Sequence, residues 1–234
     1  MHLDPISSQS VTVGPRGTVL FADLRGYTAM AERLTPIYLA TLLEQFFNRL
    51  TVEIEAHGGR VFHTAGDSLM AGFGLSDGKC DGSEEALAAA RTILTQFDSL
   101  AEQWHREAEI ETGLGIGLHL GEVALAVFGP PERRVMTLVG DTANVAARLC
   151  ARARAGEVLF SCTVAAALQA RAQAQAPAMP RVEVRANAFL QLPRYELRGR
   201  RAPLDIWCLP VLARTAPVVL ASPPWETPGA ERWQ

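Results

Sequence analysis

Two aspartates, Asp23 and Asp67, each stand where a short apolar segment gives way to a turn. Asp23 follows the apolar run Thr18–Ala22, which predicts a short buried strand. Asp67 lies in the stretch VFHTAGDSLMAGF, where two apolar runs flank Ala65-Gly66-Asp67 and predict a β-hairpin. Turn chemistry alone explains either aspartate, because Asp and Gly are common residues of tight turns.

The two carboxylates meet at one edge of a sheet if the Thr18–Ala22 strand lies beside the 61–73 hairpin. Two unpaired carboxylates that close repel each other unless a cation holds them. Carboxylates with few other protein ligands suit Mg²⁺ or Mn²⁺, and such ions usually bind substrate phosphates as well. Between the aspartates, residues 24–28 begin a predicted helix, where backbone N–H groups favour an anion. Two unrelated turn aspartates remain the alternative reading of the spacing.

A second polar pair, Asn144 and Arg148, lies in the segment that follows Gly140-Asp141 and is predicted to be helical through Ala151. The i, i+4 spacing places both side chains on one face of that helix. A solvated helix face is the more common explanation of such a pair, so the spacing alone assigns no chemistry to it.

The other predicted elements alternate between helices and strands. Pro36, with Thr35 as its cap, begins one helix, and Glu84 to Arg106 forms another. The glycine-rich stretch Gly113–Gly129 predicts two strands around Gly121, and its alternating glycines indicate a close backbone approach. Further strands are expected at 136–139, 156–161 and, as a pair, within 181–209, with a helix at 163–174. This order predicts an α+β fold with a largely antiparallel sheet.

Composition narrows the function classes. The 234 residues carry a net charge of −3, which gives no electrostatic case for binding nucleic acid or an anionic membrane surface. No apolar run approaches the length of a membrane span and no signal-peptide pattern begins the chain, so we expect a soluble, cytoplasmic protein. The four cysteines are widely spaced without a CxxC pair, which favours reduced thiols over a zinc site.

Four motifs in order, VLFADLRGYT, AGDSLMAGF, GIGLHLGEV and TLVGDTANVAARL, are similar to the class III nucleotide (adenylate/guanylate) cyclase catalytic domain. The resemblance covers roughly residues 17–210. It implies a ferredoxin-like βααβαβ core whose largely antiparallel sheet is flanked by helices. We therefore expect a flexible N-terminal arm at residues 1–16, the cyclase domain at 17–212 and a proline-rich tail at 213–234.

The resemblance also assigns roles to individual residues. It implies that Asp23, Asp67 and the backbone carbonyl of Leu24 hold two Mg²⁺ or Mn²⁺ ions per active site. It implies that Asn144 and Arg148 orient the ribose and stabilise the charged transition state. Triphosphate binding falls to the turn residues Arg25, Gly26, Tyr27 and Thr28 and to Arg200, with Arg198 as the other candidate.

Two positions depart from the family pattern in the base pocket. His63 stands where the family has an adenine-selecting lysine, and Thr137 stands where many members have an aspartate. Packing of His63 in the sheet, beside Phe62, is the alternative to a role in base recognition. A histidine and a threonine can each donate or accept a hydrogen bond, so this pair does not dictate one base.

The activity that the resemblance implies is the cyclisation of a nucleoside triphosphate, with ATP as the first candidate, to a 3′,5′-cyclic nucleotide and pyrophosphate. The family's active sites draw their metal aspartates and their Asn/Arg pair from opposite subunits. One domain that carries both sets therefore implies a head-to-tail homodimer. A guanylate cyclase, a pyrimidine cyclase of an anti-phage signalling system and a catalytically degenerate nucleotide-binding domain remain alternatives.

Overall fold

The computed structural model describes residues 11–75, 80–175, 189–196 and 203–209, and all structural statements below concern these residues. Eight strands form one sheet in the order β2-β3-β1-β4-β6-β8-β7, with β5 paired to β4 beside this path. Only β4 and β6 run parallel among the described pairs, so the sheet is largely antiparallel. The expected α+β class is confirmed.

The elements follow one another from β1 to β8, with five α-helices among them. The strands are β1 (Val11–Arg25), β2 (Arg60–Ala65), β3 (Ser68–Phe73), β4 (Gly113–Phe128), β5 (Val135–Val139), β6 (Glu157–Ser161), β7 (Leu190–Gln191) and β8 (Ile206–Leu209). The helices are α1 (Tyr27–Arg33), α2 (Pro36–Ala56), α3 (Ser83–Ala108), α4 (Asp141–Arg152) and α5 (Cys162–Gln175).

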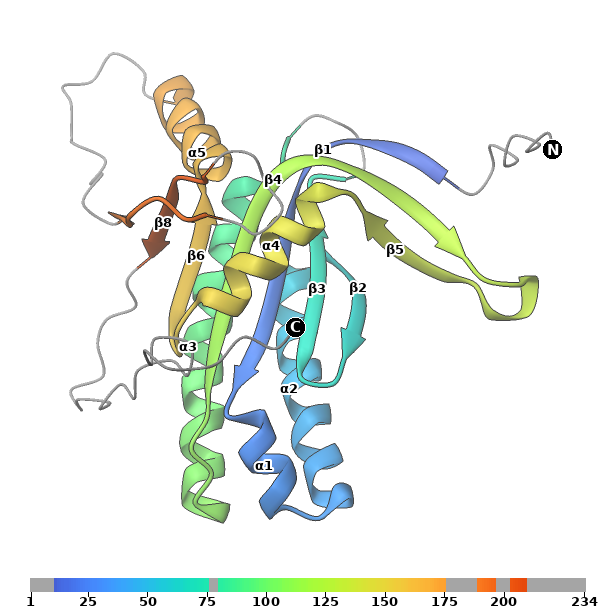
Figure 1. The fold of residues 1–234 in the computed structure, drawn as a ribbon, viewed down its shortest axis with the longest axis vertical. Coiled ribbons are helices and arrows are strands. Elements are labelled where there is room, and N and C mark those ends of the chain that lie inside the picture. The colour runs from blue at the N-terminus through green and yellow to red at the C-terminus, as the bar shows by residue number, and fades with distance from the viewer. Residues whose placement is uncertain (1–10, 76–79, 176–188, 197–202, 210–234) are drawn as a thin grey trace, which may run out of the picture.

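The helices cover both faces of the sheet (Figure 1). On one face, buried residues of α2 and α3 share one core cluster with alternate residues of β4, which are Leu114, Ile116, Leu118 and Leu120. On the other face, α4 packs Val145 and Leu149 against Leu159 of β6. The period-2 alternation of β4 therefore separates a side-chain core on the α2–α3 side from a glycine-rich surface beneath α4.

Helix α2 forms as its sequence predicts. The Thr35 hydroxyl accepts a hydrogen bond from the Tyr38 N–H over 3.4 Å, and Pro36 occupies the first helical position. Helical spacing then buries one stripe of the helix, made of Leu42, Phe46, Leu50 and Ile54. At the other end, the ring Nδ1 of His57 donates to the Glu53 carbonyl over 2.8 Å, so this histidine is a helix-terminal residue.

The predicted bounds of two strands, β1 and β4, are wrong. Gly113–Gly129 holds one long strand rather than two, because the β1–β4 ladder is continuous from Gly113 to Glu122 and Gly121 pairs with Gly17 in mid-strand. β1 begins at Val11 rather than at Thr18 and continues past Asp23 to Arg25. Beyond a register shift between Val13 and Arg16, its first residues pair with residues 124–126 of β4, and its last two pair with Leu114 and Gly113. Cross-strand pairing thus extends the sheet into a segment whose own sequence lacks periodicity.

The C-terminal prediction of paired strands is confirmed where the structure describes them. β7 and β8 pair antiparallel, and Tyr195 bridges to Leu204 beyond them. Within the described residues, no helix combines the length and the apolar character that crossing a membrane requires.

Candidate active site

The structure brings Asp23 and Asp67 to one edge of the sheet. Asp23 pairs with Ser68 in the β1–β3 ladder, and Asp67 immediately precedes Ser68 in the two-residue turn of the β2–β3 hairpin. The backbone N–H of Leu24 donates to the Asp67 carbonyl over 3.2 Å, which ties the two segments together. The juxtaposition expected from the two motifs is therefore present.

Electrostatics at Asp23 reflect this proximity. Burial raises the pKa of the Asp23 carboxyl above its ordinary value, and the negative charge of Asp67 raises the pKa further. The Arg25 guanidinium acts in the opposite sense but does not cancel the increase. Two half-buried carboxylates in mutual repulsion are the environment that a cation stabilises.

The donor set fits hard divalent ions. Carboxylate oxygens of Asp23 and Asp67, with the neighbouring Leu24 carbonyl, are the ligands that Mg²⁺ and Mn²⁺ prefer. Across the part of the chain that the structure describes, no group of three or more His, Cys, Asp or Glu side chains is placed to hold a metal. An ion at this edge would therefore take its remaining ligands from water or from a bound phosphate.

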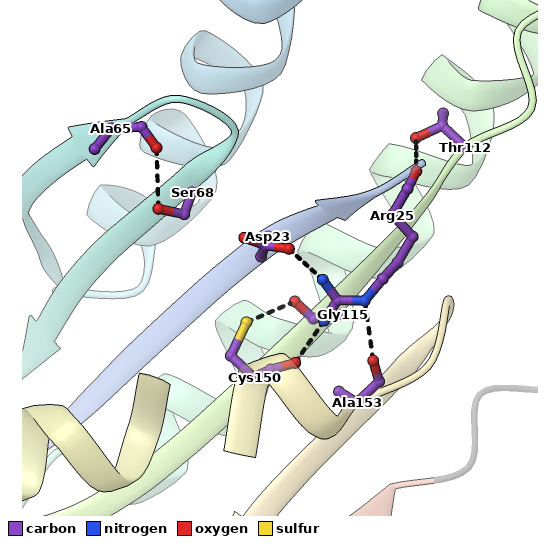
Figure 2. A network of polar contacts seen from close by, with 8 residues as sticks. All are labelled: Asp23, Arg25, Ala65, Ser68, Thr112, Gly115, Cys150 and Ala153. Atoms are coloured by element: carbon purple, nitrogen blue, oxygen red, sulfur yellow. Dashed lines mark hydrogen bonds and ion pairs between the residues drawn. The ribbon is translucent and has the colours of Figure 1, made fainter. Parts of the chain in front are cut away.

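The side chain of Arg25 makes a network that sequence reasoning missed (Figure 2). Its guanidinium pairs with a carboxylate oxygen of Asp23 and donates to two backbone carbonyls at the end of α4, those of Cys150 and Ala153. The distance from Nε of Arg25 to the carbonyl oxygen of Ala153 is 3.0 Å. The side chain thus points back across the sheet toward α4, while its backbone stays in the turn that the family resemblance assigns to the triphosphate.

Two neighbours on β4 and just before it fix this position of Arg25. The Thr112 hydroxyl donates to the Arg25 carbonyl over 2.8 Å. A Cβ atom on Gly115 would lie 2.1 Å from Nη2 of Arg25, so a side chain there would displace the guanidinium from this position. The alternating glycines did indicate a close approach at this strand, but nothing in the sequence named Arg25 as the group that fills the space.

Asn144 and Arg148 lie on the exposed side of α4, as their spacing predicts. The opposite side of the helix is buried, through Val145, Ala146 and Leu149. The helix sits very close to the sheet, because a Cβ on Gly117 would lie 2.2 Å from the Cys150 backbone nitrogen. The positions of both polar side chains are therefore set by contacts between α4 and the glycine face of β4.

His63 and Thr137 come from strands that contact each other. His63 is exposed on β2, and Thr137 is half-buried on β5. Their sequence neighbours Phe62 and Leu138 share a small apolar cluster, which holds β2 and β5 together. The exposure of His63 argues against the alternative that it serves only to pack the sheet.

The proposed triphosphate-binding residues are described in part. Gly26 adopts the left-handed conformation with φ of 83° and is the N-cap residue of α1, Tyr27 packs against the core, and Thr28 is exposed. Arg198 and Arg200 lie outside the described residues, and their assignment stays a prediction.

Strands β4 and β5 form an arm that projects from the sheet and carries Thr137. β4 and β5 extend beyond the body of the sheet (Figure 1), and three of their apolar side chains are about half exposed: Phe128, Val135 and Val139. Apolar side chains gathered on a projecting hairpin favour contact with another protein surface.

Comparison with known proteins agrees with this geometry. Residues 13–199 match the family model of the adenylate and guanylate cyclase catalytic domain. A protein named adenylate cyclase from Anabaena cylindrica is 32% identical over 150 residues, which are 62% of this chain and 30% of that protein. The chain therefore spans less than a third of this relative.

Solved structures with the same fold include cyclases of both purine specificities. The adenylyl cyclase CyaB from P. aeruginosa has a TM-score of 0.72 at 21% identity, covering 88% of this chain and 97% of that one. The guanylyl cyclase Cya2 has a TM-score of 0.70 at 25% identity, covering 90% of this chain and 99% of that one.

Proposed function

Because the chain belongs to the adenylate and guanylate cyclase catalytic-domain family, we propose that it converts ATP to 3′,5′-cyclic AMP and pyrophosphate. One observation carries this proposal: Asp23 and Asp67 meet at one sheet edge in a chain whose α4 also presents Asn144 and Arg148 on its exposed side. These are the two half-sites that the reaction needs.

Each residue has a chemical task in this reaction. Asp23, Asp67 and the Leu24 carbonyl would hold two divalent ions, which supply charge neutralisation of the triphosphate and a lowered pKa of the ribose 3′-hydroxyl. Asn144 orients the ribose so that its 3′-oxygen faces the α-phosphorus. Arg148 offsets negative charge on the α-phosphoryl group as the new P–O bond forms. The backbone of Gly26 and Thr28, with Arg200 or Arg198, binds the triphosphate.

The bond changes are those of an in-line displacement. The 3′-oxygen bonds to the α-phosphorus, the bond from that phosphorus to the bridging oxygen breaks, and pyrophosphate leaves with the electron pair. The hydroxyl proton passes to solvent, since no protein base is needed in this scheme.

Two specific observations bear on the base. The sequence likeness to the Anabaena protein named adenylate cyclase supports ATP as the substrate. The fold likeness to the guanylyl cyclase Cya2 makes GTP the second candidate. His63 and Thr137 replace a fixed cation and anion by groups that donate or accept, so we expect weaker discrimination between bases than a lysine–aspartate pair gives.

We propose that the active sites lie between two copies of the chain, arranged head to tail. Asp23 and Asp67 of one copy would face Asn144 and Arg148 of the other. The exposed apolar residues of the β4–β5 arm supply a surface that a second copy would cover.

Complementation tests this arrangement and the activity together. Asp67→Ala and Arg148→Ala are each expected to be inactive as homodimers. In the mixed dimer, the Arg148→Ala chain supplies intact aspartates and the Asp67→Ala chain supplies an intact α4, so one site is restored. Cyclic nucleotide formation should return to about half of the wild-type rate per dimer.

The controls separate a failed reaction from failed assembly. The two chains carry different affinity tags, and tandem purification isolates the mixed dimer. An inactive mixed dimer beside an active wild type would refute the shared site, and an inactive wild type would favour a degenerate nucleotide-binding domain.

A further inference from the structure

Arg25 contacts both half-sites of its own chain. Through Asp23 it touches the proposed metal half-site, and through the Cys150 and Ala153 carbonyls it touches the end of the helix that carries Arg148 (Figure 2). Under the proposed function, these half-sites belong to two different active sites of the dimer. We propose that Arg25 is a positioning residue that couples the metal half-site of one active site to the α4 half-site of the other.

The space for this coupling is built into the fold. Gly115 has no side chain where the guanidinium lies: a Cβ there would be 2.1 Å from Nη2 and 2.7 Å from Cζ. Thr112 holds the Arg25 backbone through a 2.8 Å hydrogen bond. The guanidinium is planar with a fixed fork of donors, so it can hold a carboxylate and two carbonyls at once.

The contacts at α4 fall where they control Arg148. Cys150 is two residues after Arg148, and its carbonyl lies in the last turn of the helix, where it also accepts a hydrogen bond of 3.1 Å from the N–H of the cap residue Ala153. A cation at this end also interacts favourably with the helix dipole. Loss of Arg25 would therefore loosen the last turn of α4, which directly follows Arg148.

The contact between Arg25 and Asp23 is electrostatic, and through Arg25 it connects the metal half-site to the end of α4. A divalent ion at Asp23 and Asp67 repels the guanidinium, so binding of the ion shifts Arg25 relative to α4. Linkage then requires that the state of α4 also affects binding of the ion. If the Arg25 side chain only bound the triphosphate, ion binding at Asp23 would not affect α4.

Hydrogen exchange with the metal alone tests this coupling without turnover. In wild-type protein, Mn²⁺ should change amide exchange in peptides that cover residues 148–153 by at least about twofold. Arg25→Ala should show faster exchange there without metal and no further response to Mn²⁺. Gly115→Ala, which displaces the guanidinium without removing it, should behave in the same way.

A matched control uses the nearby exposed Arg154, whose backbone N–H rather than its side chain donates the hydrogen bond to Glu157. Arg154→Ala should keep the Mn²⁺ response of the wild type. An unchanged Mn²⁺ response in Arg25→Ala would overturn the inference.

Placement of Arg25→Ala in one chain of the mixed dimer then separates its two effects. In the Arg148→Ala chain, the substitution removes a cation beside the working aspartates, and the half-saturating Mn²⁺ concentration should fall about threefold. In the Asp67→Ala chain, it loosens the working α4, and kcat should fall about tenfold at an unchanged Mn²⁺ requirement.

The outcomes distinguish this inference from the proposed function on which it rests. An inactive parent mixed dimer would refute the shared site, while the hydrogen-exchange result would still decide whether Arg25 couples Asp23 to α4. An active parent in which only placement beside the aspartates has an effect would show that Arg25 serves Asp23 or the triphosphate alone, and would overturn the coupling. Arg25→Lys keeps the charge but not the fork, so it should retain the Mn²⁺ requirement and not restore kcat.

Discussion

Gly117 of β4 lies against the backbone of Cys150 in α4, so closely that a Cβ on Gly117 would be 2.2 Å from the Cys150 nitrogen. A second backbone atom, the Ala146 carbonyl oxygen, would be 2.3 Å away. Neither atom belongs to a flexible side chain that could move aside. The packing of α4 on the sheet, and with it the position of Arg148, therefore depends on Gly117.

Gly117→Ala should lower the free energy of unfolding by about 1–3 kcal/mol, because overpacking between helix and sheet forces the backbone to shift. Catalytic rate should fall more than stability explains, since α4 carries Asn144 and Arg148. Urea titration and kcat at a temperature where the variant is folded measure the two effects. Gly58→Ala is unsuitable as a control because of its positive φ, so the control is Ala151→Ser on the exposed surface of α4, which also adds one small group to a residue of the same helix.

The contradictory outcome for the Gly117 variant is full stability with full activity. Such a result would show that α4 has freedom to move away from β4 and that its position is not fixed by this contact.

Asp23 illustrates why the fold could be predicted more fully than the site. Apolar periodicity and turn residues predicted a strand leading to Asp23, the hairpin at Asp67 and the helix that presents Asn144 and Arg148, because each depends on local sequence. The link from Asp23 through Arg25 to Cys150 joins residues more than a hundred positions apart. Such a contact depends on how α4 docks on the sheet, which no local pattern determines.

The length of β1 and β4 shows the same limit. Gly121 resembles a strand break when read alone, and it lies in mid-strand only because Gly17 pairs with it. Cross-strand pairing joins residues far apart in the sequence, so the bounds of both strands differ from those that their local sequences predict.

Asp23→Asn should be inactive yet at least as stable as the wild type at pH 7 without metal. Burial raises the pKa of Asp23, so the folded chain binds this proton more tightly than the unfolded chain does. The free energy of unfolding therefore falls as pH rises from the ordinary value of 3.8 toward the raised value, and the loss persists at neutral pH. Asparagine removes that loss.

Thermal unfolding in EDTA and in Mn²⁺ checks this prediction. Mn²⁺ should raise the Tm of the wild type and leave the Tm of Asp23→Asn unchanged. A variant that is clearly less stable than the wild type in EDTA at pH 7 would contradict the electrostatic account of Asp23.

The four thiols should differ in reactivity toward iodoacetamide at pH 8. Burial raises the pKa of Cys150 to about 12 and that of Cys208 to about 11, so neither forms appreciable thiolate. Cys80 and Cys162 are half-exposed and should be alkylated first, as peptide mass spectrometry of the native protein would show. Early labelling of Cys150 would mean that the end of α4 opens readily.

His63 and Thr137 should set base preference. His63→Lys with Thr137→Asp restores a fixed cation and anion, and should increase the ratio of ATP to GTP turnover about tenfold, the scale of one well-placed polar contact. The control variant is Arg60→Lys, on the same strand as His63, and it should leave the ratio of ATP to GTP turnover unchanged. Thr28 is exposed but unsuitable as a control, because it lies in the proposed triphosphate turn. An unaltered ratio in the double variant would remove both residues from base recognition.

Competition among the four ribonucleoside triphosphates tests the central claim most directly. Purified protein receives equimolar ATP, GTP, CTP and UTP with Mn²⁺, and mass spectrometry identifies every cyclic product, with Asp67→Ala as the matched control. We predict 3′,5′-cyclic AMP as the main product, a smaller amount of cyclic GMP, equimolar pyrophosphate and no product from the control. Absence of any cyclic nucleotide, or equal amounts from the Asp67→Ala protein, would contradict the assignment of a nucleotide cyclase site at Asp23 and Asp67.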